Sequence, residues 1–287
     1  MKKFQIKSYT KINLSLRVLK KIRKNYHNIN SLITFCHPCD LITIQRNKKL
    51  FDKIVFSGKF KKKINKKFNT LSKAMILLRT NGFLKKQYFN IHIKKNIPHG
   101  SGLGGGSSNA AALLNFLSKK MCSKLNKNLL NKIAEQVGFD VPILLEKKNT
   151  IITGRRNEIL RINKKLNLNI LIVFPNIICS TKRIYSNNKN FTRHPINFQK
   201  YINNKKKFNN FIKNEKNDLE STVIKLHPKI KKVISFIKVQ RGCYFSRITG
   251  SGSACIGIFS DEDSLILAQK LIKLKFPKYW SAISKTM

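Results

Sequence analysis

Acidic residues are scarce in this sequence. Its 287 residues include 12 Asp and Glu against 59 Lys and Arg, which gives a formal net charge of +47. Such a charge suggests nucleic acid or an anionic membrane surface as a partner. The lysines, however, are spread over the whole length among many Asn and Ile residues, a mixture that codon drift toward A and T would produce. We therefore interpret most of the charge as solvated background that still favours polyanionic ligands.

Long apolar runs are also missing. No segment approaches the ~18 residues that span a bilayer, and the N-terminus has no hydrophobic signal core, so we expect a cytoplasmic protein without a membrane partner.

A second cysteine pair at zinc spacing is missing as well. Cys36 and Cys39, with His37 between them, stand alone among six scattered cysteines. We expect these thiols to be reduced and mostly buried.

Glycine is concentrated in one stretch, residues 98–112, which read PHGSGLGGGSSNAAA. Five glycines within seven positions allow positive φ angles and let an anion approach the backbone N–H groups closely. The preceding residues 89–94 alternate between apolar and polar, as in a strand. Ser107, Ser108 and Asn109 are typical helix N-cap residues, and residues 110–117 predict a helix whose positive dipole end would face the same anion. The pattern is a strand, a phosphate-binding loop and a helix, because a flexible linker would not normally sit between such elements.

Two familiar phosphate loops are excluded. The G-x-x-x-x-G-K-[ST] pattern is absent, and so is its built-in lysine. Gly100, Gly102 and Gly105 match G-x-G-x-x-G, but no acidic residue follows about 20 positions later to hold a ribose. Between Asp52 and Glu135 the chain has no carboxylate at all.

Three polar residues outside the loop, Lys11, Asn13 and Asp140, are candidate site residues because of their neighbours in the sequence. Lys11 and Asn13 are two residues apart in an alternating segment, so their side chains are expected on one face of a strand. Asp140 is set in a turn before Val141 and Pro142. A carboxylate there is either a structural cap or a general base, and local sequence leaves both open.

Periodicity and capping signals predict the remaining elements. Strands are expected at residues 41–45, 53–57, 151–153, 158–162, 169–175, 244–249 and 256–259, and helices at 129–137, 180–185, 217–226, 230–239 and 261–274. A further helix is expected to be capped by Thr70 and to end near Gly82. Residues 187–214 give no clear prediction, and the tail after residue 274 has no functional assignment. The small-residue segment 250–255 is too tightly set between two strands for a linker.

The order of these motifs resembles that of the GHMP kinases. The motifs are, in chain order, Lys11-Ile-Asn-Leu, Asn25-Tyr-His, the glycine loop, Gly138-x-Asp-Val-Pro, Asn217-Asp-Leu-Glu and Thr249-Gly-Ser-Gly-Ser-Ala. The resemblance covers nearly the whole chain. It implies an α+β fold of two domains, an N-terminal ATP-binding domain (residues 1–162) and a C-terminal domain (163–287), with the active site in the cleft between them. It further implies ATP-dependent phosphorylation of the 2-hydroxyl group of a cytidine diphosphate sugar alcohol, in non-mevalonate isoprenoid precursor biosynthesis.

Residue roles follow from the same resemblance. Asp140 would be the catalytic base and Lys11 its partner, while Asn13 would orient the substrate alcohol. His27, which alone would pass for an ordinary surface or core histidine, would bind the cytosine together with Tyr26 and Tyr185. Gly250, Ser251 and Gly252 would close over the substrate phosphates. The ATP triphosphate, with Mg²⁺, would bind the loop formed by Pro98, His99, Gly100, Ser101, Gly102, Leu103, Gly104, Gly105, Gly106, Ser107 and Ser108. No side chain is assigned to the metal.

The chain departs from the family pattern in three places: Phe139 before the aspartate, Lys24-Asn25 before Tyr-His, and Arg156 where a Gly-Arg-Gly turn would have its second glycine. None removes a catalytic group. We expect a monomer or weak homodimer with small-molecule partners. The alternatives are a GHMP kinase for another alcohol and an RNA-binding protein, which the dispersed basic residues disfavour.

Overall fold

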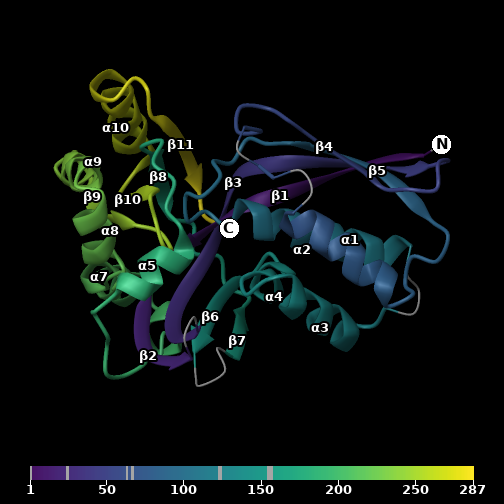
Figure 1. Ribbon diagram of the computed structural model, residues 1–287. Coiled ribbons are helices and arrows are strands. Elements are labelled where there is room, and N and C mark those ends of the chain that lie inside the picture. The colour runs from purple at the N-terminus through teal and green to yellow at the C-terminus, as the bar shows by residue number, and fades with distance from the viewer. Residues whose placement is uncertain (1, 24–25, 63, 66–67, 122–124, 154–157) are drawn as a thin grey trace. The chain divides into compact units, whose positions relative to one another are not determined.

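The computed structural model describes residues 2–23, 26–62, 64–65, 68–121, 125–153 and 158–287 (Figure 1). The chain has an α+β fold and falls into two compact units. The first unit contains the residues up to Lys11, Pro38–His99 and Gly104–Lys147. The second contains Ile12–His37, Gly100–Leu103 and Lys148–Met287. The chain therefore passes from one unit to the other directly after Lys11 and within the glycine loop.

The sheet of the first unit is built around the end of β3 (Tyr26–Asn47). Its residues 41–47 pair antiparallel with β5 (Tyr88–Lys94), and β5 pairs in parallel with β4 (Lys53–Ser57). β1 (Lys3–Asn13) also pairs with β3. Phe89, Ile91 and Ile93 of β5 are buried while His92 and Lys94 are exposed, which confirms the strand predicted before the glycine loop.

The described residues of the first unit form four helices: α1 (Thr70–Thr80), α2 (Gly105–Lys120), α3 (Lys127–Val137) and α4 (Val141–Leu144). α2 packs against the other three, and Figure 1 shows it beside α1. It also contacts β1, where the rings of Phe4 and Phe116 lie 5.1 Å apart. α1 has the predicted extent, but its N-cap is Asn69, whose side chain accepts hydrogen bonds from two backbone N–H groups. The prediction of Thr70 as the cap was therefore wrong by one residue.

The second unit contains a four-stranded antiparallel sheet in the order β11, β8, β10, β9. Its strands are β8 (Asn169–Phe174), β9 (Cys243–Ile248), β10 (Cys255–Phe259) and β11 (Trp280–Lys285). β11 comes from the tail that had no assignment, and it pairs with β8 along its whole length. β2 (Arg17–Arg23) and β6 (Asn149–Thr153) pair with the first half of β3, and β7 (Glu158–Ile162) pairs with β6.

The described helices of the second unit are α5 (Thr181–Asn187), α6 (Gln199–Ile202), α7 (Lys205–Asn214), α8 (Glu220–Leu226), α9 (Lys229–Lys238) and α10 (Glu262–Lys275). Several of them, α5, α8, α9 and α10 among them, contribute to an apolar core. The core joins Leu171 and Val173 of β8 to Ile237 of α9 and Leu265 of α10. α6 and α7 occupy the segment that gave no clear prediction, because Ile202, Phe208 and Ile212 supply just enough apolar surface to anchor them.

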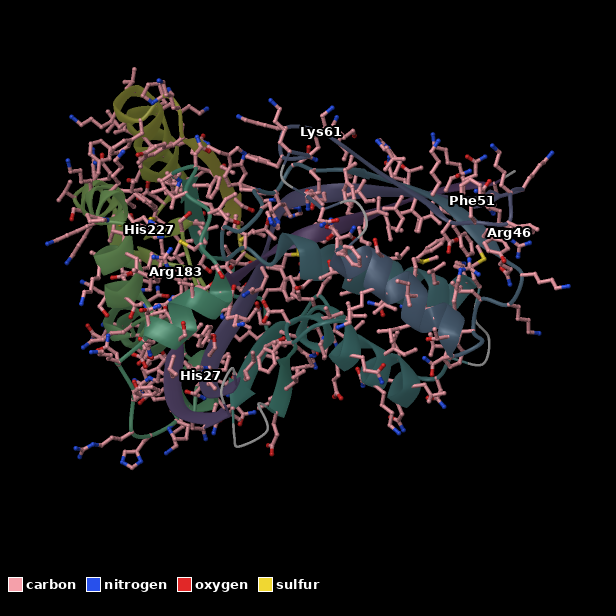
Figure 2. The ribbon with its side chains drawn as sticks, viewed as in Figure 1. His27, Arg46, Phe51, Lys61, Arg183 and His227 are labelled. Atoms are coloured by element: carbon pink, nitrogen blue, oxygen red, sulfur yellow. The ribbon has the colours of Figure 1, made fainter. Side chains whose placement is uncertain are left out.

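Lys and Arg, 59 residues against 12 Asp and Glu, dominate the charged side chains. Figure 2 shows nitrogen-tipped side chains projecting from helices and strands across the whole view. Within the described part of the chain, no helix combines the length and the apolar character required to cross a bilayer.

Candidate active site

An ion pair joins two of the predicted site residues. The ammonium nitrogen of Lys11, in β1, lies 3.4 Å from a carboxylate oxygen of Asp140. The lysine side chain is 7% exposed and the aspartate side chain 37%. Burial of the lysine strengthens its effect on the carboxylate, while the exposed aspartate remains accessible to a ligand. The cation of such a pair can offset negative charge on a ligand bound nearby.

Asp140 lies at the start of α4, where the structure tests one of its two sequence interpretations, and its role as a general base stays a prediction. It is the N-cap residue of α4, but its side chain makes no capping hydrogen bond. The interpretation as a structural cap is therefore wrong. The ion pair also forms although Phe139 precedes the aspartate, because the phenylalanine side chain points outward and is 44% exposed.

Gly104 lies directly against the lysine. Its φ angle is +70°, and a Cβ atom at this position would lie 3.2 Å from both Cβ and Cε of Lys11. Any larger residue would strain the backbone and press on the lysine side chain. The missing side chain of Gly104 thus leaves the space that the Lys11 side chain occupies in its ion pair with Asp140.

The second half of the glycine loop forms the start of α2. The helix begins at Gly105 with Gly104 as its N-cap, so Ser107, Ser108 and Asn109 lie inside the helix and the prediction that they cap it was wrong. The first backbone N–H groups of a helix have no intrahelical partner, and the dipole there favours an anion. Within the described structure, the buried hydroxyl oxygen of Ser108 also has no hydrogen-bond partner. This hydroxyl suits a phosphate oxygen or an oxygen-preferring cation such as Mg²⁺.

The first half of the loop belongs to the second unit and contacts the other small-residue loop. The carbonyl oxygen of Ser101 accepts a hydrogen bond of 2.9 Å from the N–H of Ala254. A Cβ atom on Gly102 would overlap the carbonyl oxygen of Thr249. Pro98 is buried and His99 is exposed at the start of the loop. The structure therefore brings together the two glycine-rich segments that the sequence placed almost 150 residues apart.

Asn13 also lies beside the segment 250–252. Its backbone N–H donates to the hydroxyl of Thr249 at 2.8 Å, and its side-chain amide donates to the hydroxyl of Ser31 at 2.8 Å. A Cβ atom on Gly250 would lie 3.2 Å from the amide oxygen of Asn13. The hydroxyls of Ser251 and Thr181 are 2.9 Å apart. These contacts hold the segment 250–252 against the start of α5 and the end of β1.

Two aromatic rings, those of Tyr185 and Phe191, lie beside the ring of His27. The ring centroid of Tyr185 lies 4.9 Å from that of His27, and the ring of Phe191 stacks on the histidine at 6.5 Å. The structure thus confirms the proximity of His27 and Tyr185. The side chain of Tyr26 falls outside the described structure, as do Lys24, Asn25 and Arg156. Phe191 was not predicted as a site residue. Its side chain is 46% exposed, and in the sequence it stands out only as an aromatic residue within a segment rich in Lys and Asn.

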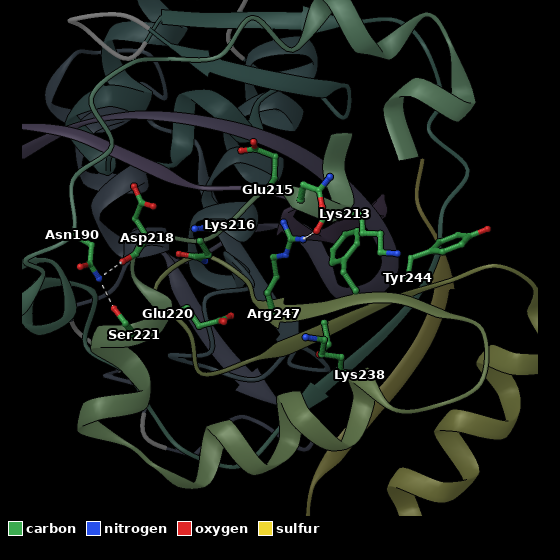
Figure 3. A pocket seen from close by; sticks show the side chains of 14 residues that line it. Asn190, Lys213, Glu215, Lys216, Asp218, Glu220, Ser221, Lys238, Tyr244 and Arg247 are labelled. Carbon is green, nitrogen blue, oxygen red and sulfur yellow. Dashed lines mark hydrogen bonds between the residues drawn. The ribbon is translucent and has the colours of Figure 1, made fainter. Parts of the chain in front are cut away.

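A cavity of about 610 Å³ in the second unit contains none of the predicted site residues (Figure 3). Arg247, one of its lining residues, donates hydrogen bonds to the carbonyl oxygens of Leu14, Ile212 and Lys213 at 3.0–3.1 Å. Burial lowers the pKa of this guanidinium to about 10, although the nearby charge of Glu220 raises it. Arg247 therefore closes the C-terminal end of α7 and has a structural role.

The cysteines match the expectation from sequence. The five described cysteines are free, and Cys36, Cys179 and Cys255 are buried. Burial raises the pKa of Cys179 to about 11. Among the described residues, no group of three His, Cys, Asp or Glu side chains could hold a metal ion.

Comparison with known proteins agrees with this geometry. Residues 69–147 match the model of the GHMP kinases N terminal domain, and residues 198–277 match that of the GHMP kinases C terminal domain. A protein of Pelagibacter ubique (strain HTCC1062), named 4-diphosphocytidyl-2-C-methyl-D-erythritol kinase, is 38% identical over 289 residues, which cover both chains completely. The chain belongs to the GHMP kinase family. As a GHMP kinase it is an enzyme, and the family uses ATP as the phosphoryl donor.

Other relatives of this GHMP kinase are similar over their full length. A protein of the same name from Wolbachia sp. subsp. Brugia malayi (strain TRS) is 34% identical, with 98% of this chain and 97% of the relative covered. Among solved structures, a 4-(cytidine 5'-diphospho)-2C-methyl-D-erythritol kinase aligns with a TM-score of 0.77 at 21% identity, covering 99% of this chain and 98% of that one. A homoserine kinase from Cytophaga hutchinsonii aligns with a TM-score of 0.70 at 16% identity, covering 98% and 95%. These structures share the fold.

Proposed function

We propose that this GHMP kinase transfers the γ-phosphoryl group of ATP to the 2-hydroxyl group of 4-diphosphocytidyl-2-C-methyl-D-erythritol, a step of the non-mevalonate isoprenoid pathway. The Lys11–Asp140 ion pair beside Gly104 carries the proposal. The names of the full-length relatives support the choice of substrate.

The reaction requires a new bond between the substrate oxygen and the γ-phosphorus, while the bond from that phosphorus to the β-bridging oxygen breaks. Asp140 accepts the proton of the attacking hydroxyl. A carboxylate is a weak base toward an alcohol, but phosphoryl transfer has a loose transition state, so positioning and charge neutralisation supply most of the rate. Lys11 contacts Asp140 and offsets negative charge on the reacting oxygens. Asn13, two residues along β1, orients the substrate alcohol.

The loop from Pro98 to Ser108 binds the ATP triphosphate through backbone N–H groups and the start of α2. The buried Ser108 hydroxyl without a partner supports this role and is our candidate for a contact to Mg²⁺ or to a phosphate oxygen. When bound, Mg²⁺ neutralises charge on the β- and γ-phosphate oxygens.

The cytosine ring binds at His27. Imidazole nitrogens can exchange hydrogen bonds with the edge of a pyrimidine, and Tyr185 offers a face for stacking. We add Phe191 to this group, because its ring stacks on His27 and is half exposed. The segment Gly250–Gly252 contacts the substrate phosphates through its hydroxyl and backbone N–H groups.

The test incubates the purified chain with MgATP and 4-diphosphocytidyl-2-C-methyl-D-erythritol and follows the release of ADP and of the 2-phosphate product. Parallel reactions with homoserine and mevalonate, substrates of kinases with the same fold, measure specificity. Formation of product with the cytidine substrate alone is expected. Turnover of another alcohol with no turnover of the cytidine substrate would reject the substrate assignment while keeping the reaction class.

A further inference from the structure

The carboxylate of Asp40 is the centre of a buried polar cluster in the first unit. Asp40 is completely buried and forms an ion pair with the ammonium group of Lys95. Its Oδ1 accepts hydrogen bonds from the backbone N–H groups of Asn96 at 2.7 Å and Ile97 at 2.9 Å. Its Oδ2 accepts a further one from the side-chain amide of Asn109 at 3.0 Å. The hydroxyl of Ser8 donates to the amide oxygen of Asn109, also at 3.0 Å.

Such a cluster is costly unless every member is satisfied. Burial raises the pKa of Asp40 and lowers that of Lys95, while the attraction between the two groups opposes both shifts. Replacing a buried ion pair by apolar residues of similar volume is often neutral or stabilising. Stability alone therefore does not explain why a chain with so few carboxylates keeps one here. Its hydrogen bonds to particular segments indicate a role in fixing their geometry.

These segments lie on the two sides of the glycine loop. Asn96 and Ile97 immediately precede Pro98, and Asn109 lies in α2, just after the loop ends. The ammonium group of Lys95 also approaches the start of α2, since a Cβ atom on Gly105 would lie 3.5 Å from it. One carboxylate thus holds the backbone before the loop and the helix after it.

The loop between these anchors needs such support. Gly100, Gly102 and Gly104 all have positive φ angles, from +63° to +81°. Glycines have the widest choice of backbone conformations, so an unanchored loop of this composition would lose much entropy when it closes around a ligand. Anchors that fix the conformation in advance lower that cost.

We propose that Asp40 is a positioning residue that holds both sides of the 98–108 loop in its ATP-binding conformation, with Asn109 and Ser8 completing the connection to α2. The proposal rests on the proposed function in one respect, the assignment of this loop to the ATP triphosphate. It does not depend on which alcohol is phosphorylated.

The test measures the dissociation constant of MgATP by calorimetry on the full chain and its variants. Asp40→Asn keeps the size of the side chain but removes the charge and turns one acceptor into a donor. We expect it to weaken MgATP binding about tenfold or more. At saturating ATP, kcat should fall by less than about threefold, because the loop still reaches the bound conformation. Asn109→Ala removes the α2 connection alone and is the second variant if Asp40→Asn fails to fold.

Asp52 provides a matched control in the same unit. Like Asp40 it forms an ion pair, here with Arg79 at 2.7 Å, and it accepts a hydrogen bond from a backbone N–H, that of Phe89, at 2.8 Å. These contacts lie at the other end of β5. Asp52→Asn should lower the melting temperature and leave MgATP affinity within about twofold. Hydrogen exchange of residues 98–108 should accelerate in Asp40→Asn and Asn109→Ala and stay unchanged in Asp52→Asn.

Three results would overturn the proposal. Unchanged MgATP affinity and loop exchange in both Asp40→Asn and Asn109→Ala would show that the cluster serves stability alone. An equal loss of affinity in Asp52→Asn would show that any lost ion pair has this effect. A folded parent chain that does not bind MgATP would remove the loop assignment itself. A parent chain that binds MgATP but does not phosphorylate the cytidine substrate would count against the proposed substrate, and the comparison of affinities would still decide the role of Asp40.

Discussion

Lys11 and Asp140 meet at 3.4 Å although 129 positions separate them in the chain, and a Cβ atom on Gly104 would touch the lysine at 3.2 Å. A cation, a carboxylate and the start of α2 therefore lie together in the first unit.

Removal of either charge of the ion pair should abolish most activity. We expect Asp140→Asn and Lys11→Met to lower kcat by about a hundredfold or more, because the first removes the base and the second removes the charge that supports it. Steady-state kinetics with saturating substrates measure the effect. The control is Glu146→Gln, which breaks the exposed pair with Lys127, also 3.4 Å long, in the same unit. Near-parental kcat in either catalytic variant would contradict the proposed mechanism.

Substitution of Gly104 should disturb catalysis through Lys11. Gly104→Ala introduces a side chain at a φ angle of +70° and in contact with the lysine, so we expect kcat to fall about tenfold or more. Gly82→Ala is the control, because its φ is +72° but no atom lies within 4 Å of the added Cβ. Both variants should lose about 1 kcal/mol of stability from backbone strain. Equal kinetics in the two would show that the contact with Lys11 is unimportant.

Truncation of the rings beside His27 should weaken substrate binding. We expect Tyr185→Ala and Phe191→Ala to raise KM for the cytidine substrate by an amount that corresponds to about 1–3 kcal/mol of lost stacking. KM for ATP should stay the same. Tyr244→Ala serves as control, because Tyr244 belongs to the same unit and is 41% exposed. A change in KM for ATP alone would argue against a base-binding role.

The Ser108 hydroxyl should matter for the metal nucleotide. Since it is buried without a hydrogen-bond partner in the described structure, we expect Ser108→Ala to fold normally and to weaken MgATP binding by about tenfold. Titration of Mg²⁺ at fixed ATP distinguishes a metal contact from a phosphate contact, because only the first shifts the Mg²⁺ dependence. Ser118→Ala, further along α2, is the control and should change neither the MgATP affinity nor the Mg²⁺ dependence. Unchanged MgATP binding in Ser108→Ala would contradict a contact between this hydroxyl and the metal nucleotide.

The N-cap of α10 should make stability depend on pH. Hydrogen bonds from Ser260 and Ser264 lower the pKa of Asp261 below its ordinary value of 3.8. A carboxyl whose pKa is lower in the folded state stabilises the fold above its unfolded pKa, and this stabilisation is lost as the pH falls through the folded value. Asp261→Asn keeps an N-cap acceptor but removes the titrating group. Its denaturation midpoint should therefore decline less steeply than that of the parent below a pH of about 4, and parallel declines would contradict the expectation.

Tertiary contacts revised several local predictions. Only residues 41–45 of β3 were expected as a strand, but β3 has 22 residues, because β2, β6 and β5 pair with successive parts of it. β11 was missed because its six residues lack clear alternation, and it is a strand only through its pairing with β8. The start of α2 was placed too late, since Gly104 takes the cap position that Ser107 or Ser108 would prefer by residue type. The single domain boundary between residues 162 and 163 stays a prediction.

The sequence by itself determined the order of strand, glycine loop and helix within residues 89–117, though not the start of the helix, and the membership of the GHMP kinases. Alternation, glycine content and motif order depend on neighbouring residues, so they can be read without the fold. Only the tertiary structure decided that Asp140 pairs with Lys11 and makes no cap, that Phe191 stacks on His27, and that Asp40 holds both sides of the loop. The partners in these contacts are more than 50 positions apart, and only chain packing determines which buried polar groups satisfy one another.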